Sequence, residues 1–271
     1  MGRPWIVLVV YLTAVALIVF VSGLALVTLK AWLPDVPDHE IVQSLPGLLA
    51  GSLAASSALL LTVLVAERPL EPARLGLLPG RETGRALAIM VVGMLALGQG
   101  LDSGTQLAGF DATGTTATVR RALEGAYGPG LAAAILVIGV GAGAAEEIFF
   151  RGVMQRRLRL GWKPLPAVAV TSAGFAVLHV DAQGSPVPIV LAFALSLYLG
   201  FVAELAGSTL PALVCHVVNN VVFTLQVGLG WSVLPYRANA ALALGGAVVF
   251  LVCAVWLRRA LAARSPSPPA T

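Results

Sequence analysis

The chain alternates long uncharged apolar runs with short charged clusters, and this pattern predicts transmembrane helices. Crossing about 30 Å of hydrocarbon takes roughly 20 mainly apolar residues at ~1.5 Å each. Eight stretches meet this requirement: 5–29, 43–66, 86–108, 129–150, 165–181, 187–206, 209–229 and 239–257. Asp102 interrupts the third stretch, and the fifth is short. We therefore predict an all-α fold, a polytopic membrane bundle of about eight transmembrane helices.

Composition supports this interpretation. Hydrophobic residues make up 58% and charged residues 11% of the chain, with a mean hydropathy of +0.90, whereas soluble proteins carry about 25% charged residues. We expect one integral membrane domain over residues 1–264, with a motif-bearing core at about 129–229, and a disordered tail over 265–271. The first apolar run, Trp5 to Leu29, exceeds the roughly 7–15 residues of a signal-peptide core, so we expect it to remain as the first helix.

The basic residues predict the orientation of the chain. With eight spans and a cytoplasmic N-terminus, 13 of the 17 basic residues fall on the inner side. They are Arg3, Arg68, Arg74, Arg81, Arg85, Arg151, Arg156, Arg157, Arg159, Lys163, Arg258, Arg259 and Arg264. The positive-inside rule then places both termini in the cytoplasm. Because the basic residues flank apolar runs, we expect the lipid bilayer, and not nucleic acid, as their partner.

Two further compositional features bear on location and redox state. Lysine is represented only by Lys30 and Lys163 while arginine, alanine and glycine abound, which suggests a GC-rich bacterial genome and hence a bacterial inner membrane. Cys215 and Cys253 both lie inside apolar stretches, so we predict buried thiols without a disulfide.

Ionisable side chains within a span are costly unless they are paired or face a polar cavity, so they indicate function. Three segments in the second half carry such residues: Glu146–Arg151, Phe175–His179 and His216–Asn220. Glu147 and Arg151 are four residues apart and share a helix face, so we expect them to pair. Glu146 points about 100° away from Glu147 and is predicted to be the freer carboxylate.

Helical rise brings these side chains to a similar depth. From the inner boundary, Glu146 lies about 15 Å and His179 about 24 Å into the membrane. His216 lies about 12 Å and Asn220 about 18 Å deep, on one face of their helix. Allowing for helix tilt of several ångströms, all four could meet.

Such a set suits peptide hydrolysis inside the membrane. An unpaired carboxylate can act as general base toward a water molecule. Two imidazoles can orient that water, or can bind a divalent metal such as zinc with the carboxylate; the metal ligands would then be Glu146, His179 and His216. An asparagine amide can donate to the oxyanion of a tetrahedral intermediate.

The three motifs, EExxxR at Glu146–Arg151, FxxxH at Phe175–His179 and HxxxN at His216–Asn220, occur in this order and each in a hydrophobic span. In this respect the chain resembles the CAAX protease and bacteriocin-processing (CPBP, or Abi) family, which includes the type II CAAX prenyl endopeptidases. The resemblance covers roughly Val137 to Thr224.

The resemblance implies an eight-helix intramembrane endopeptidase that acts on a membrane-associated protein or peptide. It also implies that Glu146 is the water-activating base, that His179 and His216 surround the same water, and that Asn220 stabilises the oxyanion. Glu147 and Arg151 would form a supporting pair. Eukaryotic members trim prenylated CAAX proteins, whereas for a bacterial member peptide maturation or bacteriocin immunity is the expected context.

Other interpretations compete with this one. The same fold could serve as a non-catalytic membrane scaffold or immunity protein, or the buried Glu and His residues could line a cation or proton pathway. Asn219 competes with Asn220, although it lies off the motif register. Motifs of other intramembrane proteases, HExxH, GxSG and GxGD, do not occur in the sequence.

Overall fold

The computed structural model describes residues 4–110, 114–180 and 184–262, and within these ranges all regular secondary structure is helical. Seven of the described helices are long and apolar enough to cross a membrane. They are α1 (Pro4–Trp32), α3 (Leu45–Ala66), α4 (Gly84–Leu107), the continuous helix Gly128–Arg159, α10 (Val187–Ala206), α11 (Leu210–Gly228) and α12 (Tyr236–Ala262). An eighth apolar helix, α9 (Pro164–Val177), has 14 residues. The predicted polytopic bundle of about eight helices is confirmed; its predicted tail, 265–271, lies outside the described residues.

The fourth span is longer than the predicted 129–150. It runs without a break through α6 (Gly128–Ala134), the π-helix η1 (Ile135–Ala142), α7 (Gly143–Glu147), the π-helix η2 (Ile148–Gln155) and α8 (Arg156–Arg159). The prediction ended the span at the EExxxR charges, and this was wrong. Those charges lie in the middle of the helix because other buried groups of the bundle neutralise them.

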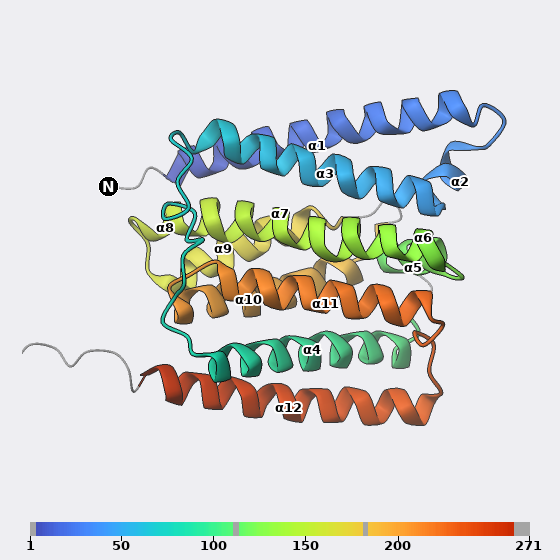
Figure 1. The fold of residues 1–271 in the computed structure, drawn as a ribbon. Helices are drawn as coiled ribbons and strands as arrows, with labels where there is room; N and C mark the ends of the chain where they lie inside the picture. Colours follow the sequence, from blue (N-terminus) through green and yellow to red (C-terminus); the bar gives the residue numbers. More distant parts are fainter. Residues whose placement is uncertain (1–3, 111–113, 181–183, 263–271) are drawn as a thin grey trace, which may run out of the picture.

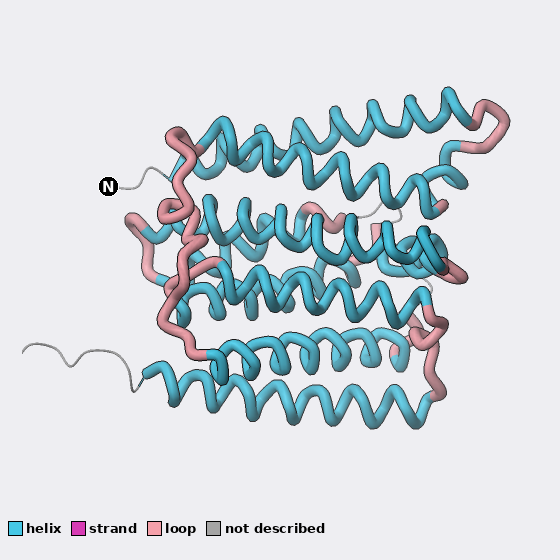
Figure 2. Tube along the Cα trace, in the orientation of Figure 1, coloured by secondary structure: helices cyan, strands magenta, loops and turns pink. Residues whose placement is uncertain are grey.

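The fifth span is shorter than the predicted 165–181, since α9 ends at Val177. Beyond it the chain reaches Gly184, whose φ of 72° is left-handed, and then Pro186, which precedes α10. Neither residue suits a continuing helix. After α9 the chain therefore leaves its helix within the length of the bundle (Figure 2).

The helices form layers in which the motif-bearing elements lie in the middle (Figure 1). α1 and α3 pack together on one side, and α4 and α12 pack together on the other. Between these two pairs lie the long helix of α6 to α8, α9, α10 and α11. Two short helices, α2 (Asp38–Gln43) and α5 (Gly114–Leu123), lie at one end of the bundle. The outer pairs thus cover the central helices on two sides, while side chains of the central helices such as Leu136 and Val190 remain exposed.

The outer helices carry the lipid-facing surface. Large apolar side chains project from α1 and α12; for example, Phe20 is 69% and Leu244 70% exposed. Small residues let α12 approach α4 closely, since a Cβ atom on Gly246 would lie 2.7 Å from the carbonyl oxygen of Ala96. Close backbone approach of this kind is typical of helix packing in lipid. The chain is a multi-pass membrane protein.

The two ends of the bundle differ in charge. We call the end at which α1 begins and α12 ends the terminal face; the 67–83 loop and α8 also lie there (Figures 1 and 2). Its described basic residues are Arg68, Arg74, Arg81, Arg85, Arg156, Arg157, Arg159, Lys163, Arg258 and Arg259. This grouping follows the predicted inner set, and the cytoplasmic location of this face stays a prediction.

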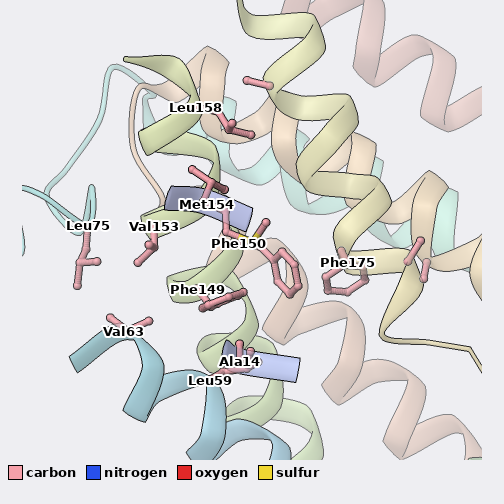
Figure 3. Close-up of a cluster of buried hydrophobic side chains, with 14 residues drawn as sticks. Ala14, Leu59, Val63, Leu75, Phe149, Phe150, Val153, Met154, Leu158 and Phe175 are labelled. Carbon is pink, nitrogen blue, oxygen red and sulfur yellow. The ribbon is translucent and has the colours of Figure 1, made fainter. Parts of the chain in front are cut away.

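A buried apolar cluster supports the middle of the long helix (Figure 3). Phe149 and Phe150 are fully buried in η2, with their ring centroids 5.0 Å apart. Phe150 also contacts Phe175 of α9 edge-on at 5.1 Å. α1 and α3 close this cluster with Ala14, Leu59 and Val63. The cluster fixes η2 against α9 directly beside the charged motif residues.

Candidate active site

Close helix packing places α11 against the motif-bearing part of the long helix. A Cβ atom on Gly139 would lie 2.8 Å from Val221 Cγ2, and one on Gly143 would lie 3.4 Å from Val217 Cα. Glycine at both positions lets the backbones approach, so that the side chain of His216 reaches the level of Glu146 and Glu147. The EExxxR and HxxxN motifs meet through this contact.

Glu147 and Arg151 form the predicted ion pair, which is confirmed with Glu147 Oε1 2.6 Å from Arg151 Nη1. Both side chains are 0% exposed, where an unpaired charge would cost several kcal/mol. Arg151 Nη2 donates to both the carbonyl oxygen and Oγ of Ser196, each at 2.7 Å. Sequence reasoning did not identify Ser196, although it is a polar residue within the predicted 187–206 span. It provides the bonds that let the arginine remain buried.

His216 lies between two carboxylates. Its Nδ1 is 2.8 Å from Glu147 Oε1, and its Nε2 is 3.5 Å from Glu146 Oε2. Because Glu147 is ionised by its pairing with Arg151, Nδ1–H of the imidazole donates to it. Glu147 therefore orients His216 as well as pairing with Arg151, a contact that helical spacing within one helix could not predict.

His179 lies just beyond the end of α9 and contacts Phe175. Its Nδ1 lies 2.9 Å from the carbonyl oxygen of Phe175. A carbonyl only accepts, so Nδ1 carries the proton and Nε2 is left as an acceptor in the neutral ring. The Phe175 ring packs against His179 at 4.6 Å and against His216 at 5.9 Å between centroids. Phe175 is buried and contacts both histidines.

The two asparagines of the HxxxN segment face different neighbours. Asn219 points toward α4, since a Cβ atom on Gly98 would lie 2.4 Å from Asn219 Oδ1. Asn220 lies one turn beyond His216 and is half-buried. Its amide has no hydrogen-bond partner among the described residues. Of the two, Asn220 is the one whose donor is available to a ligand on the His216 side.

Exposure separates the two glutamates. The side chain of Glu146 is 24% exposed, whereas that of Glu147 is 0% exposed. The two π-helices flank these residues directly, and such widened turns occur frequently at functional sites. Glu146 is thus the carboxylate that water and substrate can reach.

The geometry does not assemble the His₂Glu metal set that the sequence allowed. No three His, Cys, Asp or Glu side chains in the described part of the chain are grouped to hold a metal ion. Both ring nitrogens of His216 face carboxylates, and Nδ1 of His179 donates to a backbone carbonyl. The chemistry of the site is therefore derived from its side chains alone.

The segment that contains the three motifs is also the part of the chain that resembles a known protein family. Residues 128–222 match the family model described as type II CAAX prenyl endopeptidase Rce1-like. This part of the chain is CAAX-protease-like. The match extends from the start of α6 into α11 and includes Glu146, His179, His216 and Asn220. No curated protein and no solved structure matches the chain.

The CAAX-protease-like match confirms the resemblance drawn from the three motifs. Because the matched family is one of endopeptidases, the chain is protease-like at the level of the family. Its individual site residues remain assigned by chemistry and geometry.

Three other polar residues lie apart from this CAAX-protease-like site. His39 is 72% exposed in the short helix α2. Tyr198 donates to the carbonyl oxygen of Met90 at 2.8 Å and packs against α4. Glu204 binds Arg159 at 3.0 Å at the terminal face. The two cysteines are buried free thiols, as predicted.

Proposed function

We propose that the chain is an intramembrane endopeptidase that hydrolyses a peptide bond in a membrane-associated protein or peptide, using water activated by Glu146. The observation that carries the proposal is the placement of His216, held by the buried Glu147–Arg151 pair and aimed at the more accessible Glu146. A carboxylate beside an oriented imidazole provides the groups that general base catalysis needs.

The protonation states follow from the hydrogen bonds. Nδ1–H of His216 donates to Glu147, and Nδ1–H of His179 donates to Phe175. Each ring thereby presents Nε2 as the reactive nitrogen. Glu146, the more exposed carboxylate, accepts one proton of the water, while Nε2 of His216 or of His179 accepts a hydrogen bond from its other O–H group.

Hydrolysis then proceeds in two proton transfers. As Glu146 takes a proton, the water oxygen forms a bond to the carbonyl carbon of the substrate and a tetrahedral oxyanion results. The side-chain amide of Asn220 donates to that oxyanion. The protonated Glu146 gives its proton to the leaving nitrogen as the C–N bond breaks. One water molecule is consumed, and a carboxylate and an amine are released.

The position of the site supports a membrane-associated substrate. Glu146 lies near the middle of a 32-residue helix, well inside the bundle (Figure 1). A soluble polypeptide would have to leave water to reach it, whereas a segment held at the membrane by an apolar anchor is already concentrated there. The matched family model names a prenyl endopeptidase, which is one form of such an anchored substrate.

The proposal is tested by comparing peptide termini in the membrane proteomes of cells that carry wild type or Glu146→Gln at matched protein levels. Glu124→Gln is the matched control, because Glu124 is an exposed carboxylate outside the site. We expect at least one cleavage product that occurs with wild type and Glu124→Gln and is missing with Glu146→Gln. Identical termini in all three strains would refute the proposed mechanism.

A further inference from the structure

A second concave site lies at the terminal face, apart from Glu146 and His179. It is a cavity of about 640 Å³, lined by the 67–83 loop, by η2 and α8, and by the end of α10 with the start of α11. This volume lies within the ~300–1,000 Å³ typical of small-molecule sites. Arg151 and Gln155 line it from η2, and we call it the terminal-face pocket.

The lining of the terminal-face pocket is strongly basic. Six arginines and two glutamates contribute to it. Glu67 is paired with Arg157 at 2.6 Å, and Glu204 with Arg159 at 3.0 Å. Arg151 is neutralised by Glu147, and Arg74 by Glu71 outside the lining at 3.3 Å.

Two arginines of the pocket have no carboxylate partner within the described ranges. Arg81 Nη2 donates to the carbonyl oxygen of Glu204 at 3.1 Å. Arg156 donates to the carbonyl oxygens of Arg74, at 2.9 Å, and of Ala73, at 3.2 Å. Carbonyl oxygens hold a guanidinium in place without cancelling its charge. The nearby carboxylate of Glu82 accepts instead from the backbone N–H of Gly80.

Two glycines make room for these guanidinium groups. A Cβ atom on Gly76 would lie 2.8 Å from Arg156 Nη1, and one on Gly207 would lie 3.4 Å from Arg81 Nε. Both glycines have left-handed φ values, 65° and 69°. The α11 helix also begins here, after Ser208 and Thr209, and its N-terminus adds a positive potential.

The floor of the pocket carries polar atoms that lack partners in the described part of the chain. Arg151 Nε and Gln155 Oε1 are both buried without a hydrogen bond, on residues that are 1% and 2% exposed. One is a donor and the other an acceptor. A ligand that satisfied both would offer an acceptor oxygen to Arg151 Nε and a donor, such as a hydroxyl, to Gln155 Oε1.

We propose that the terminal-face pocket binds the headgroup of an anionic phospholipid that carries hydroxyl groups beside its phosphate, of the phosphatidylglycerol class. The phosphate lies between Arg81 and Arg156, and a headgroup hydroxyl donates to Gln155. Leu160, which lines the pocket and is 74% exposed, offers an apolar rim for the glycerol ester region. Basic pockets between transmembrane helices at the cytoplasmic side commonly hold anionic headgroups.

Binding is measured with delipidated full-length protein in neutral detergent, titrated with fluorescent phosphatidylglycerol or phosphatidylcholine. We expect saturable binding of phosphatidylglycerol and much weaker binding of phosphatidylcholine. The variant Arg81→Gln with Arg156→Gln should lose about 25-fold in affinity, since each basic group near an anionic lipid contributes a factor of about five. Arg258→Gln with Arg259→Gln is the matched control, because it removes two exposed charges from the same face outside the pocket.

Three outcomes would overturn the proposal. An equal loss of affinity in the Arg258→Gln with Arg259→Gln control would show that binding depends only on general surface charge. Equal affinity for the two lipids would show that the site does not require an anionic headgroup. Competition by soluble glycerol phosphate at the concentration at which the lipid binds would assign the site to a free phosphate.

A charge-preserving variant guards against simple misfolding. Arg81→Lys with Arg156→Lys keeps both positive charges but disrupts the guanidinium bonds to the carbonyl oxygens of Glu204, Arg74 and Ala73. Recovery of most of the affinity by this variant supports a headgroup site. Loss equal to that of the glutamine variant would show that the guanidinium groups only fix the 67–83 loop, and would overturn the proposal. None of these measurements depends on proteolysis.

Discussion

Two carboxylate–guanidinium pairs lie within the length of the bundle, and their surroundings differ. Glu147 and Arg151 belong to one helix, are 0% exposed, and lie between α10 and α11. Asp102 of α4 pairs with Arg120 of α5 near the opposite end, where their side chains are 21% and 11% exposed. The first pair holds a histidine against a second carboxylate. The second connects elements of the fold.

The neighbours of Asp102 and Arg120 show what a purely structural pair looks like. Gln106 donates to Asp102 and to the carbonyl oxygen of Ser232, both at 3.0 Å, and Arg120 donates to the same carbonyl. Arg120 also lies over the Phe223 ring, 5.4 Å from its centroid. The Asp102 carboxylate is bound by both Arg120 and Gln106, and it positions no second titratable side chain among the described residues. A buried charge therefore indicates catalysis only when it positions a second group that substrate can reach.

The largest expected difference between the two pairs concerns His216. His216→Gln should lower the rate of substrate cleavage by about 10²–10⁴-fold, the range for loss of a proton-handling group, with the bundle still folded. His39→Gln is the matched control, since that histidine is 72% exposed in α2, apart from the site. Cleavage kinetics in detergent would measure both. A His216→Gln protein that retained the rate of wild type would place His216 with the structural groups.

Removing each arginine should separate the pairs by stability. Arg151→Met leaves Glu147 buried and uncompensated, so the free energy of unfolding should fall by about 3–5 kcal/mol. Arg120→Met leaves Asp102 partly exposed and still bound by Gln106, so about 1–2 kcal/mol is expected. Unfolding of the purified proteins in detergent would measure both losses.

A double variant separates stability from activity at the buried pair. Replacing both charges, with Glu147→Gln and Arg151→Met, should recover most of the lost stability, because a neutral buried pair carries no desolvation penalty. Activity should stay low, since His216 has lost its orienting carboxylate. Recovery of both properties would show that Glu147 has no positioning role.

A smaller effect is expected at the adjacent asparagines of α11, of which only one is proposed to take part in catalysis. Asn220→Ala should lower kcat by about 10²–10³-fold with KM little changed, as expected for loss of an oxyanion donor. Asn219→Ala removes a side chain that faces Gly98 of α4, and should leave kcat near that of wild type. Steady-state kinetics of the two variants side by side would check this. The opposite ranking would reassign the oxyanion role to Asn219.

The sequence predicted the spans well where hydropathy alone defines them. The eight apolar stretches correspond to seven long helices and the shorter α9. The prediction failed where charged residues are buried. The span predicted at 129–150 stopped before Arg151, because nothing in the neighbouring sequence shows that Ser196, 45 residues away, binds that side chain. The early end of α9 was also missed, because apolar residues continue to Leu178 and the helix-disfavouring Gly184 and Pro186 lie beyond the predicted span.

The sequence predicted which residues belong to the candidate site, but not most of the contacts between them. Spacing correctly predicted the Glu147–Arg151 pair, because both partners belong to one helix. The bond from His216 to Glu147 joins residues 69 positions apart. It depends on the close approach at Gly139 and Gly143, which the sequence shows only as small residues. Asp102 was likewise taken as a weakness of the third span, although it is the partner of Arg120.

The smallest expected effect concerns Gln106, which also accepts from Asn239 Nδ2 at 3.0 Å and so joins α4, α12 and the 229–235 loop. Gln106→Leu removes partly exposed hydrogen bonds that water can replace, so stability should fall by only about 1 kcal/mol. Amide hydrogen exchange should quicken in the 229–235 loop and stay unchanged in α7, while cleavage retains the rate of wild type. Faster exchange in α7 would mean that the two pairs are coupled through the bundle. Unchanged exchange there would establish that the structural pair and the proposed catalytic pair act independently, although α4 contacts α11 along much of its length.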